Sequence, residues 1–252
     1  MRARRVVHLV AHRGNAAEFP ENTLPGVISA FELGLRFAEI DVQISRDGVP
    51  VVIHDHMLTR TAALNESVLE MSAAEITAVD AAETARFGDR FAGLKVPLLS
   101  EMIKVLGNYP QAVLFIEIKR ASLARFGHDQ VVGNILDVIR PYRSQCVLIS
   151  FDLPAVFRAR QQSGVRIGWV LSEYDSHTQL KCEALRPEFL FCDHHKLPGD
   201  AAALWRGTWK WVIYEIAELS LAVELARRGA DYIETMRVRA MSREIRRGPD
   251  GE

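Results

Sequence analysis

The amino-acid sequence predicts an α/β fold of the (β/α)8 type, the TIM barrel, and three observations support this expectation. Short runs rich in Val, Ile and Phe alternate with amphipathic stretches of helical spacing, a pattern typical of βα units around a parallel sheet. The chain contains eight such apolar runs. Its 252 residues are also the length that a barrel of eight units requires. We therefore expect one barrel domain over residues 1–252.

The expected elements follow in chain order from these runs and from the helical spacing between them. Strands are expected at residues 5–12, 37–45, 112–119, 145–151, 165–171, 188–193, 209–215 and 231–235. Helices are expected at residues 23–34, 100–107, 128–140, 153–162, 176–186, 200–205 and 217–228.

One irregularity interrupts the alternation after the second strand. Asp47 and Gly48 form a strong hairpin signal, so the run that follows should return antiparallel to the second strand. Residues 56–96, which include a short helix in "MSAAEITAV", are too long for a plain connection. We expect them to form a small insertion over the active-site face. The charged tail that begins at Ser242 should fray.

Composition narrows the possible partners. With 31 basic and 32 acidic side chains the formal charge is -1, which favours neither nucleic acid nor an anionic membrane surface. Three widely spaced cysteines form neither a disulfide framework nor a zinc motif, which fits a cytoplasmic protein. No apolar run approaches the roughly 18 residues that a membrane span requires. The sequence does not indicate an oligomeric state.

Three acidic residues in apolar strands predict a metal site. Glu39 and Asp41 are two residues apart on one strand, so their side chains point to the same face. Two like charges at this spacing require a cation, and Glu117 on the next barrel strand can add a third carboxylate. Such an all-oxygen site suits Mg²⁺ or Ca²⁺. For any single acid, an ion pair at a strand end is the alternative.

Two histidines at strand ends predict proton transfer. An imidazole can accept a proton from a nucleophile while a second, protonated imidazole donates one to a leaving oxygen. His12 and His54 lie where two different strands end, and both are candidates for these roles. Arg13 and Lys119 are candidates for binding phosphate oxygens. A structural, hydrogen-bonded role is the alternative for each histidine.

The "PENT" segment precedes the first helix. We expect Asn22 and Thr23 to cap that helix, with Pro25 in its first turn. Glu21 is a candidate for orienting Arg13 or His12 from behind.

The segment "FCDHHKLP" near the sixth strand looks at first like a metal-binding cluster. Adjacent side chains on a strand point to opposite faces, so we do not expect Asp193, His194 and His195 to share one ion. Asp193 or one of the histidines is expected to line the barrel mouth. Phe151 in "SFD" is a candidate apolar wall for the substrate.

Five motifs together carry a family resemblance. The stretches "HRGNAAEFPENTLPGVISAFELG", "EIDVQISRDGVPVVIHDHMLTRT", "VPLLSEMI", "FIEIK" and "LISFD" resemble the glycerophosphodiester phosphodiesterase family from His12 to about Asp152. The resemblance implies a TIM barrel with a small insertion after the second strand. It also implies hydrolysis of a glycerophosphodiester to sn-glycerol 3-phosphate and an alcohol.

The same resemblance implies roles for individual residues. The implied metal ligands are Glu39, Asp41 and Glu117, and the implied acid and base are His12 and His54. By analogy with attack of the glycerol 2-hydroxyl on phosphorus, His12 is expected to be the base and His54 the acid. The implied contacts to phosphate are Arg13 and Lys119.

The C-terminal third departs from the family pattern. Relatives tend to have "WTVN" where this chain has "WVIYE", and "DGIITDRP" where it has "DYIETMRV". Trp211 matches the family tryptophan, which implies stacking against the substrate, whereas Trp205 and Trp209 are expected to be packing residues. Substrate contacts in this third are therefore left open.

Three alternative functions share these residues. A lysophospholipase D-like enzyme would need a lipid-accepting mouth, whereas the insertion is alanine-rich and charged, which favours a soluble small-molecule substrate. A catalytically inactive, metabolite-binding barrel would not need the intact acids and histidines. A metal-dependent lyase would need a basic lysine such as Lys119.

Overall fold

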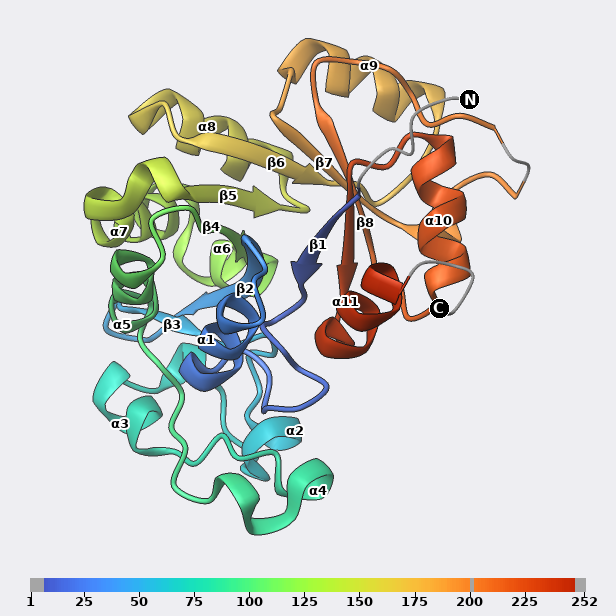
Figure 1. Ribbon diagram of the computed structural model, residues 1–252. Helices are drawn as coiled ribbons and strands as arrows, with labels where there is room; N and C mark the ends of the chain where they lie inside the picture. Colours follow the sequence, from blue (N-terminus) through green and yellow to red (C-terminus); the bar gives the residue numbers. More distant parts are fainter. Residues whose placement is uncertain (1–6, 200–201, 248–252) are drawn as a thin grey trace.

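A computed structural model describes residues 7–199 and 202–247 of the chain (Figure 1). Eight parallel strands are hydrogen-bonded in the order β1-β9-β8-β7-β6-β5-β4-β2, and pairing of β1 with β2 closes the ring. The strands are β1 (His8–Ala11), β2 (Phe37–Ile44), β4 (Val113–Ile118), β5 (Cys146–Ser150), β6 (Arg166–Val170), β7 (Phe189–Asp193), β8 (Lys210–Tyr214) and β9 (Tyr232–Thr235). The TIM barrel and its eight strands are thereby confirmed, although residues 5 and 6 of the first expected strand lie outside the described residues.

The expected hairpin is also confirmed. Strand β3 (Pro50–Val52) pairs antiparallel with β2, with Val52 opposite Val42, and lies outside the closed barrel. Gly48 in the turn has a φ of 83°, which glycine adopts without steric cost. The hairpin leads the chain directly into the insertion.

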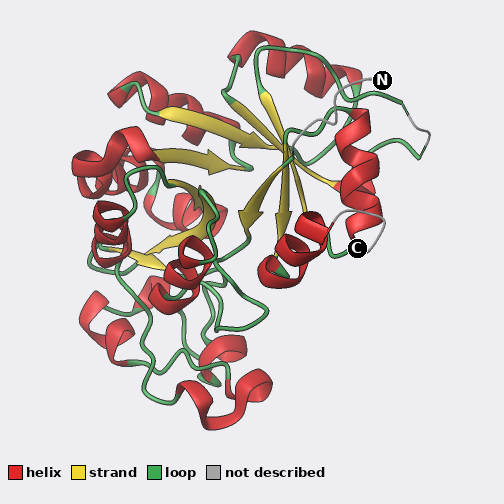
Figure 2. Ribbon diagram, in the orientation of Figure 1, coloured by secondary structure: helices red, strands yellow, loops and turns green. Residues whose placement is uncertain are grey.

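Helices surround the strands, as Figure 2 shows. They are α1 (Leu24–Glu32), α5 (Leu99–Met102) with the 3₁₀ helix η3 (Ile103–Asn108), α6 (Arg120–Phe126), α7 (His128–Ile139) with η4 (Arg140–Gln145), α8 (Leu153–Ser163), α9 (Ser176–Leu185), η5 (His194–Lys196), α10 (Leu219–Arg228) and α11 (Val238–Arg247). Helix α6 was not expected. Gly127, with a φ of 82°, separates it from α7.

One expectation about the C-terminal third is wrong. The helix expected over residues 200–205 is absent from its described part, residues 202–205. Arg228 donates to the carbonyl of Ala202, and the Leu204 amide donates to the Arg228 carbonyl, so this segment is bonded to α10 instead. Residues 242–247 of the tail that was expected to fray continue helix α11, in which the side chains of Val238 and Met241 are buried. The rest of that tail, residues 248–252, lies outside the described residues.

Residues 56–96 form the insertion, and Figure 1 shows its helices α2, α3 and α4 together beyond α1 and β3. Its elements are α2 (Thr59–Ala62), η1 (Val68–Glu70), α3 (Ala73–Ala78), α4 (Thr84–Phe87) and η2 (Gly88–Phe91). The expected helix is α3, which begins with a capping box between Ser72 and Glu75. A small apolar cluster joins the insertion to β3: Val51, Ile53, Leu58, Val68, Leu69, Ile76, Ala81 and Val96.

The barrel interior is filled by a layer of aromatic rings. Tyr232 packs against Phe37 at 4.9 Å between ring centroids, and Phe115 packs against Phe189 at 5.0 Å. These rings close the barrel as a packed core rather than a pore. Side chains two residues further along each strand point to the same interior, closer to the carboxyl ends of the strands. That next layer holds the charged residues described below.

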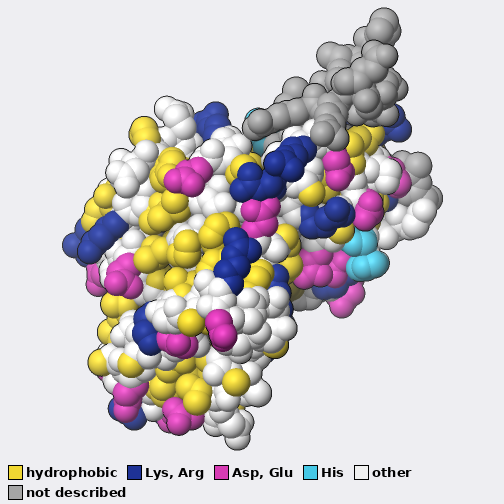
Figure 3. Space-filling model, turned by 60° about the horizontal axis from the view of Figure 1, so that its bottom comes forward, with side chains coloured by type: hydrophobic (Ala, Val, Ile, Leu, Met, Phe, Trp, Pro, Cys, Tyr) yellow, Lys and Arg dark blue, Asp and Glu magenta, His cyan; other side chains and the backbone are white. Residues whose placement is uncertain are grey.

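Two features of the described part of the chain concern possible partners: the length of its helices and the charges on its surface. No helix among the described residues is long and apolar enough to cross a lipid bilayer. On the face shown in Figure 3, Lys and Arg side chains are interspersed with Asp and Glu side chains between apolar patches. Positive and negative charges are therefore mixed over this face.

Candidate active site

Three carboxylates meet at the carboxyl end of the barrel. Glu39 and Asp41 lie on β2, and Glu117 lies on β4, where it pairs with Asp41. One carboxylate oxygen from each of the three lies within 4.8 Å of the others. The carboxyl ends of barrel strands are where TIM-barrel enzymes place their active sites. The structure thus brings together the three residues that the sequence predicts as metal ligands.

Two cations lie among these acids. The Lys119 Nζ donates to Asp41 Oδ1 at 3.1 Å and to Glu117 Oε1 at 2.8 Å. The Arg13 Nε lies 3.2 Å from Asp41 Oδ2. Burial raises the pKa of Asp41, but Lys119 and Arg13 outweigh burial and hold it below its ordinary value. Asp41 is therefore ionised. Arg13 and Lys119, the two cations expected to bind phosphate, both lie beside the carboxylates.

Glu39 is the least satisfied of the three acids. Its Oε2 accepts a hydrogen bond from the backbone N–H of Arg13 at 3.1 Å. Arg13 itself has a left-handed φ of 54°. Its Oε1 is buried without a hydrogen-bond partner among the described residues. Burial raises the pKa of Glu39 well above its ordinary value, and Asp41 and Glu234 add to this. A buried carboxylate oxygen without a partner is costly, and a cation is the group that fits it.

His12 directly follows β1 and is buried beside Glu39. Its Nε2 lies 3.9 Å from Glu39 Oε2. Burial, together with the charge of Arg13, lowers the pKa of His12 to about 3. The imidazole is therefore neutral near pH 7 and has the form that can accept a proton.

His54 follows β3 and is partly exposed. Its Nδ1 lies 2.7 Å from Asp55 Oδ1, while Asp55 Oδ2 accepts from Arg60 Nε at 2.7 Å. The side chain of Gln43 donates to the His54 carbonyl at 2.9 Å. A carboxylate on Nδ1 fixes the ring and leaves Nε2 for proton exchange with a ligand.

Glu21 connects the two sides of the site. It accepts from Arg13 Nη1 at 3.1 Å and from Arg60 Nη2 at 2.7 Å. Its backbone N–H donates to Glu83 Oε1 at 2.7 Å, and the side chain of Glu83 is itself buried. Glu21 thus contacts Arg13, as the sequence suggests, whereas Arg60 and Glu83 are not among the sequence-predicted site residues. Both come from the insertion.

The N-cap position of Thr23 and the place of Pro25 in the first turn of α1 are as expected, but neither Asn22 nor Thr23 caps the helix with its side chain. Asn22 does not cap the helix. Its Nδ2 donates to Asp41 Oδ2 at 2.9 Å, and its Oδ1 accepts from the backbone N–H of Asp41 at 3.0 Å. Thr23 occupies the cap position, but its hydroxyl donates to the Pro20 carbonyl instead. With a φ of 59°, Asn22 turns the chain so that its amide holds Asp41 in place.

Aromatic residues of the later strands lie in two different places. Phe151 follows β5 and packs on the barrel interior, with Lys196 5.9 Å above its ring centre. Trp211 is not part of the site. It packs with Ile213 between the sheet and the helices, and its Nε1 donates to the Trp205 carbonyl at 2.8 Å. Because strand side chains alternate, Val212 and Tyr214 are the β8 residues that face the interior.

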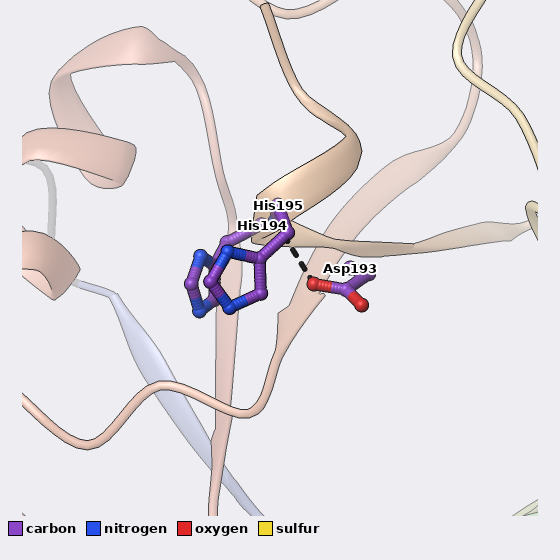
Figure 4. Close-up of side chains that lie close together, drawn as sticks. All are labelled: Asp193, His194 and His195. Atoms are coloured by element: carbon purple, nitrogen blue, oxygen red, sulfur yellow. Dashed lines mark hydrogen bonds between the residues drawn. The ribbon is translucent and has the colours of Figure 1, made fainter. Parts of the chain in front are cut away.

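Asp193, His194 and His195 were expected to point to opposite faces of a strand and therefore not to share one ion. This reason is wrong, because the three residues do not continue a strand. Asp193 ends β7, and His194 and His195 begin η5. Their possible ligand atoms lie within 4.8 Å of one another. Figure 4 shows the two rings beside each other, with centroids 3.7 Å apart, while Asp193 Oδ1 accepts from the His195 backbone N–H at 2.9 Å. A capped turn accounts for this arrangement.

The model of the glycerophosphoryl diester phosphodiesterase family matches residues 12–190, more than half of the chain. The chain belongs to this family. A glycerophosphodiester phosphodiesterase from Caldanaerobacter subterraneus subsp. tengcongensis is 39% identical over 146 residues, which are 57% of this chain and 58% of that protein. The chain therefore aligns with less than two thirds of that family member's length.

Solved structures of glycerophosphoryl diester phosphodiesterases and related phosphodiesterases share the fold. A phosphodiesterase from Oleispira antarctica, solved in complex with the product sn-glycerol-3-phosphate, has a TM-score of 0.82 at 24% identity and covers 95% of this chain and 96% of its own. A glycerophosphodiester phosphodiesterase from Agrobacterium tumefaciens has a TM-score of 0.75 at 25% identity, covering 95% and 100%. The chain therefore shares the barrel fold of these solved structures over almost its whole length.

Proposed function

We propose that this protein hydrolyses glycerophosphodiesters to sn-glycerol 3-phosphate and an alcohol with the help of a divalent cation. The observation that carries the proposal is the convergence of Glu39, Asp41 and Glu117 with His12 at the carboxyl end of the barrel. Membership of the family supports it. The similarly folded phosphodiesterase with bound sn-glycerol-3-phosphate gives further support, because this is the product that we propose.

The carboxylates fit a hard divalent cation, Mg²⁺ or Ca²⁺. Glu39, Asp41 and Glu117 would hold it, since oxygen ligands suit both ions and Glu39 Oε1 is a buried acceptor without a partner. When bound, the cation supplies positive charge that offsets the charge on the phosphate oxygens. Arg13 and Lys119 supply further positive charge at the same place.

The histidines divide the proton transfers between them. His12, which is neutral near pH 7 and lies beside Glu39, accepts the proton of the attacking glycerol 2-hydroxyl. His54, oriented by Asp55, donates a proton to the oxygen of the departing alcohol as its bond to phosphorus breaks. Water then opens the cyclic phosphate that the first step leaves, and sn-glycerol 3-phosphate is the product.

The test is an assay of purified protein with glycerophosphocholine, glycerophosphoethanolamine and a lysophospholipid, with glycerol 3-phosphate measured by a coupled dehydrogenase. Release of glycerol 3-phosphate from the soluble diesters is the expected result. Preference for the lysophospholipid would favour the lysophospholipase D-like activity, and binding without turnover would favour an inactive metabolite-binding barrel. Formation of a carbonyl product would favour a lyase.

Two further expectations, on the domain organisation and on the location in the cell, are proposed with the function. We propose that residues 1–252 act as one domain, because the insertion supplies Arg60 and Glu83 to the barrel's site. We propose a cytoplasmic location, which the three free, buried cysteines support. Fractionation of cells that produce the protein tests the location, and a single unfolding transition tests the domain.

A further inference from the structure

A fourth acidic side chain faces the barrel interior from the last strand. Glu234 on β9 is 3% exposed, and its Oε1 has no hydrogen-bond partner among the described residues. Residues 12–190, which the family model matches, do not include it. A buried, unpartnered carboxylate in an apolar strand is costly and needs a physical reason.

The layers of the barrel show where Glu234 points. Two residues earlier on β9, the ring of Tyr232 lies 4.9 Å from that of Phe37 and 6.5 Å from that of Phe115. Side chains two apart on a strand point to the same face, so the next layer contains Glu234 together with Glu39 and Glu117. Glu234 therefore faces the carboxylate cluster from the opposite side of β1, which separates β9 from β2.

The electrostatics agree with this position. Burial raises the pKa of Glu234 well above its ordinary value, and the charges of Glu117 and Asp41 raise it further. Glu234 in turn raises the pKa of Glu39.

When all four acids are ionised, the charges of the site do not balance without a further cation. The four carboxylates of Glu39, Asp41, Glu117 and Glu234 face the two cations Arg13 and Lys119. Glu21 and Arg60 offset each other. Two negative charges remain in a buried layer when all four acids are ionised, and one divalent cation would balance them.

We propose that Glu234 is a fourth carboxylate of the divalent-cation site, facing the ion from β9 while Glu39, Asp41 and Glu117 face it from β2 and β4. This inference rests on the proposed metal-dependent function. Two unpartnered oxygens, one on Glu39 and one on Glu234, belong to the same layer. Glu234 is not in the group of carboxylates whose oxygens lie within 4.8 Å of one another, so its oxygen would reach the ion through a water bound to it. The two strands that flank β1 thus hold the ion between them.

The experiment compares metal affinity directly. Ca²⁺ and Mg²⁺ are titrated separately, by calorimetry, into chelator-treated wild type, Glu234→Gln and the control Glu215→Gln. Glu215 follows β8, is exposed, and carries the same charge near the barrel mouth. Glu234→Gln should weaken the tighter-binding ion by about tenfold to a hundredfold, as loss of groups around a metal does. Glu215→Gln should change it by less than about threefold, because an exposed charge is screened.

An unchanged affinity in Glu234→Gln would overturn the inference. An equal loss in both variants would also overturn it, because it would show a general effect of charge at the barrel mouth rather than a contact with the ion.

A stability arm separates metal binding from packing. Glu234→Ile should raise the melting temperature in excess chelator, since it replaces an uncompensated buried carboxylate with an apolar side chain. The same variant should show a smaller melting-temperature rise on addition of Ca²⁺ than the wild type. A lower melting temperature in chelator together with an unchanged Ca²⁺ response would show that Glu234 is a packing residue and would overturn the proposal.

The two levels of the argument fail in different ways. If the wild type binds the ion and releases glycerol 3-phosphate while Glu234→Gln binds equally well, this inference alone fails. If the wild type binds the ion and releases no glycerol 3-phosphate, the proposed function fails, and a weaker affinity in Glu234→Gln still supports the role of Glu234. If the wild type binds neither ion, both fail.

Discussion

The two halves of the barrel, with β9, β1, β2 and β4 in the first and β5 to β8 in the second, present different side chains to one interior. Strands β1 to β4 present His12, Glu39, Asp41, Glu117 and Lys119 at their carboxyl ends. Strands β5 to β8 present an interior of mainly apolar and aromatic side chains, namely Val147, Ile149, Phe151, Val170, Phe189, Phe191, Val212 and Tyr214. The first half therefore carries the candidate chemistry, and the second half is the candidate wall for a substrate.

The insertion adds to this difference because it serves the first half. Arg60 reaches both Glu21 and Asp55, and Glu83 accepts from the backbone of Glu21. These contacts connect the surroundings of His12 to those of His54. The comparison teaches that the candidate catalytic residues are held by neighbours far away in sequence. The predictions below test this difference between the halves in decreasing order of expected effect.

The largest loss is expected from the histidines of the first half. His12→Ala should lower kcat/KM for a glycerophosphodiester by about 10³-fold, within the range for loss of a general base. His54→Ala should have a similar effect. Steady-state kinetics measure both, with circular dichroism to verify the fold. His56→Ala is the matched control, because His56 is exposed and close in sequence, and it should keep wild-type activity. Wild-type turnover in His12→Ala would remove the base assignment.

Loss of the cation should be almost as severe. Excess chelator should abolish turnover, and Mg²⁺ or Ca²⁺ should restore it, because the acids would otherwise repel the phosphate. Glu39→Gln should lower kcat/KM by about a hundredfold and raise the ion concentration needed for half-maximal rate. Titration of the rate against each ion measures this. Full activity in chelator would contradict the role of the carboxylates.

An intermediate effect is expected from the insertion. Arg60→Met removes the bridge between Glu21 and Asp55 and should lower kcat by about tenfold to a hundredfold, as loss of orienting groups does. The matched control is Arg90→Met, an exposed arginine of the same insertion that stacks on Phe91. Parallel kinetics of the two variants provide the measurement. Equal kcat values would mean that the insertion does not orient the histidine.

The smallest effect is expected from the wall. Phe151→Ala should raise KM for the preferred diester by severalfold with little change in kcat, because the loss of a partly buried ring contact is worth roughly 1 kcal/mol. Phe157→Ala on α8, where the ring is 47% exposed, is the control. A large fall in kcat with KM unchanged would place Phe151 among the catalytic residues instead.

The sequence predicts the barrel well because strand formation here is a local signal. Each of the eight apolar runs became a strand, and the Asp47-Gly48 turn became a hairpin. Elements that depend on distant contacts were predicted poorly. Residues 202–205 are not helical because their backbone bonds to α10, and α11 is helical because Val238 and Met241 are buried.

The same division applies to the site. The three acids of β2 and β4 could be predicted because charge in an apolar strand is visible in the sequence. Glu234 carries the same signal in "DYIET" and was not singled out, because that region departs from the family pattern. The partners of Asn22 and Arg60 lie 19 and 39 residues away, and no local pattern reveals them. Trp211 matches a motif position, but the motif does not say which face of β8 it occupies.

The hydrogen bond from the Glu21 backbone to the buried carboxylate of Glu83 connects the insertion to the segment that holds Arg13 and Glu21. Local opening of residues 56–96 would release Glu21, and with it the guanidinium groups that it aligns, while the distant strands stayed closed. Inactivation by heat or denaturant should then precede the loss of secondary structure. Hydrogen exchange at the Glu21 amide would report this local opening, at which the proposed activity is lost while the barrel stays folded.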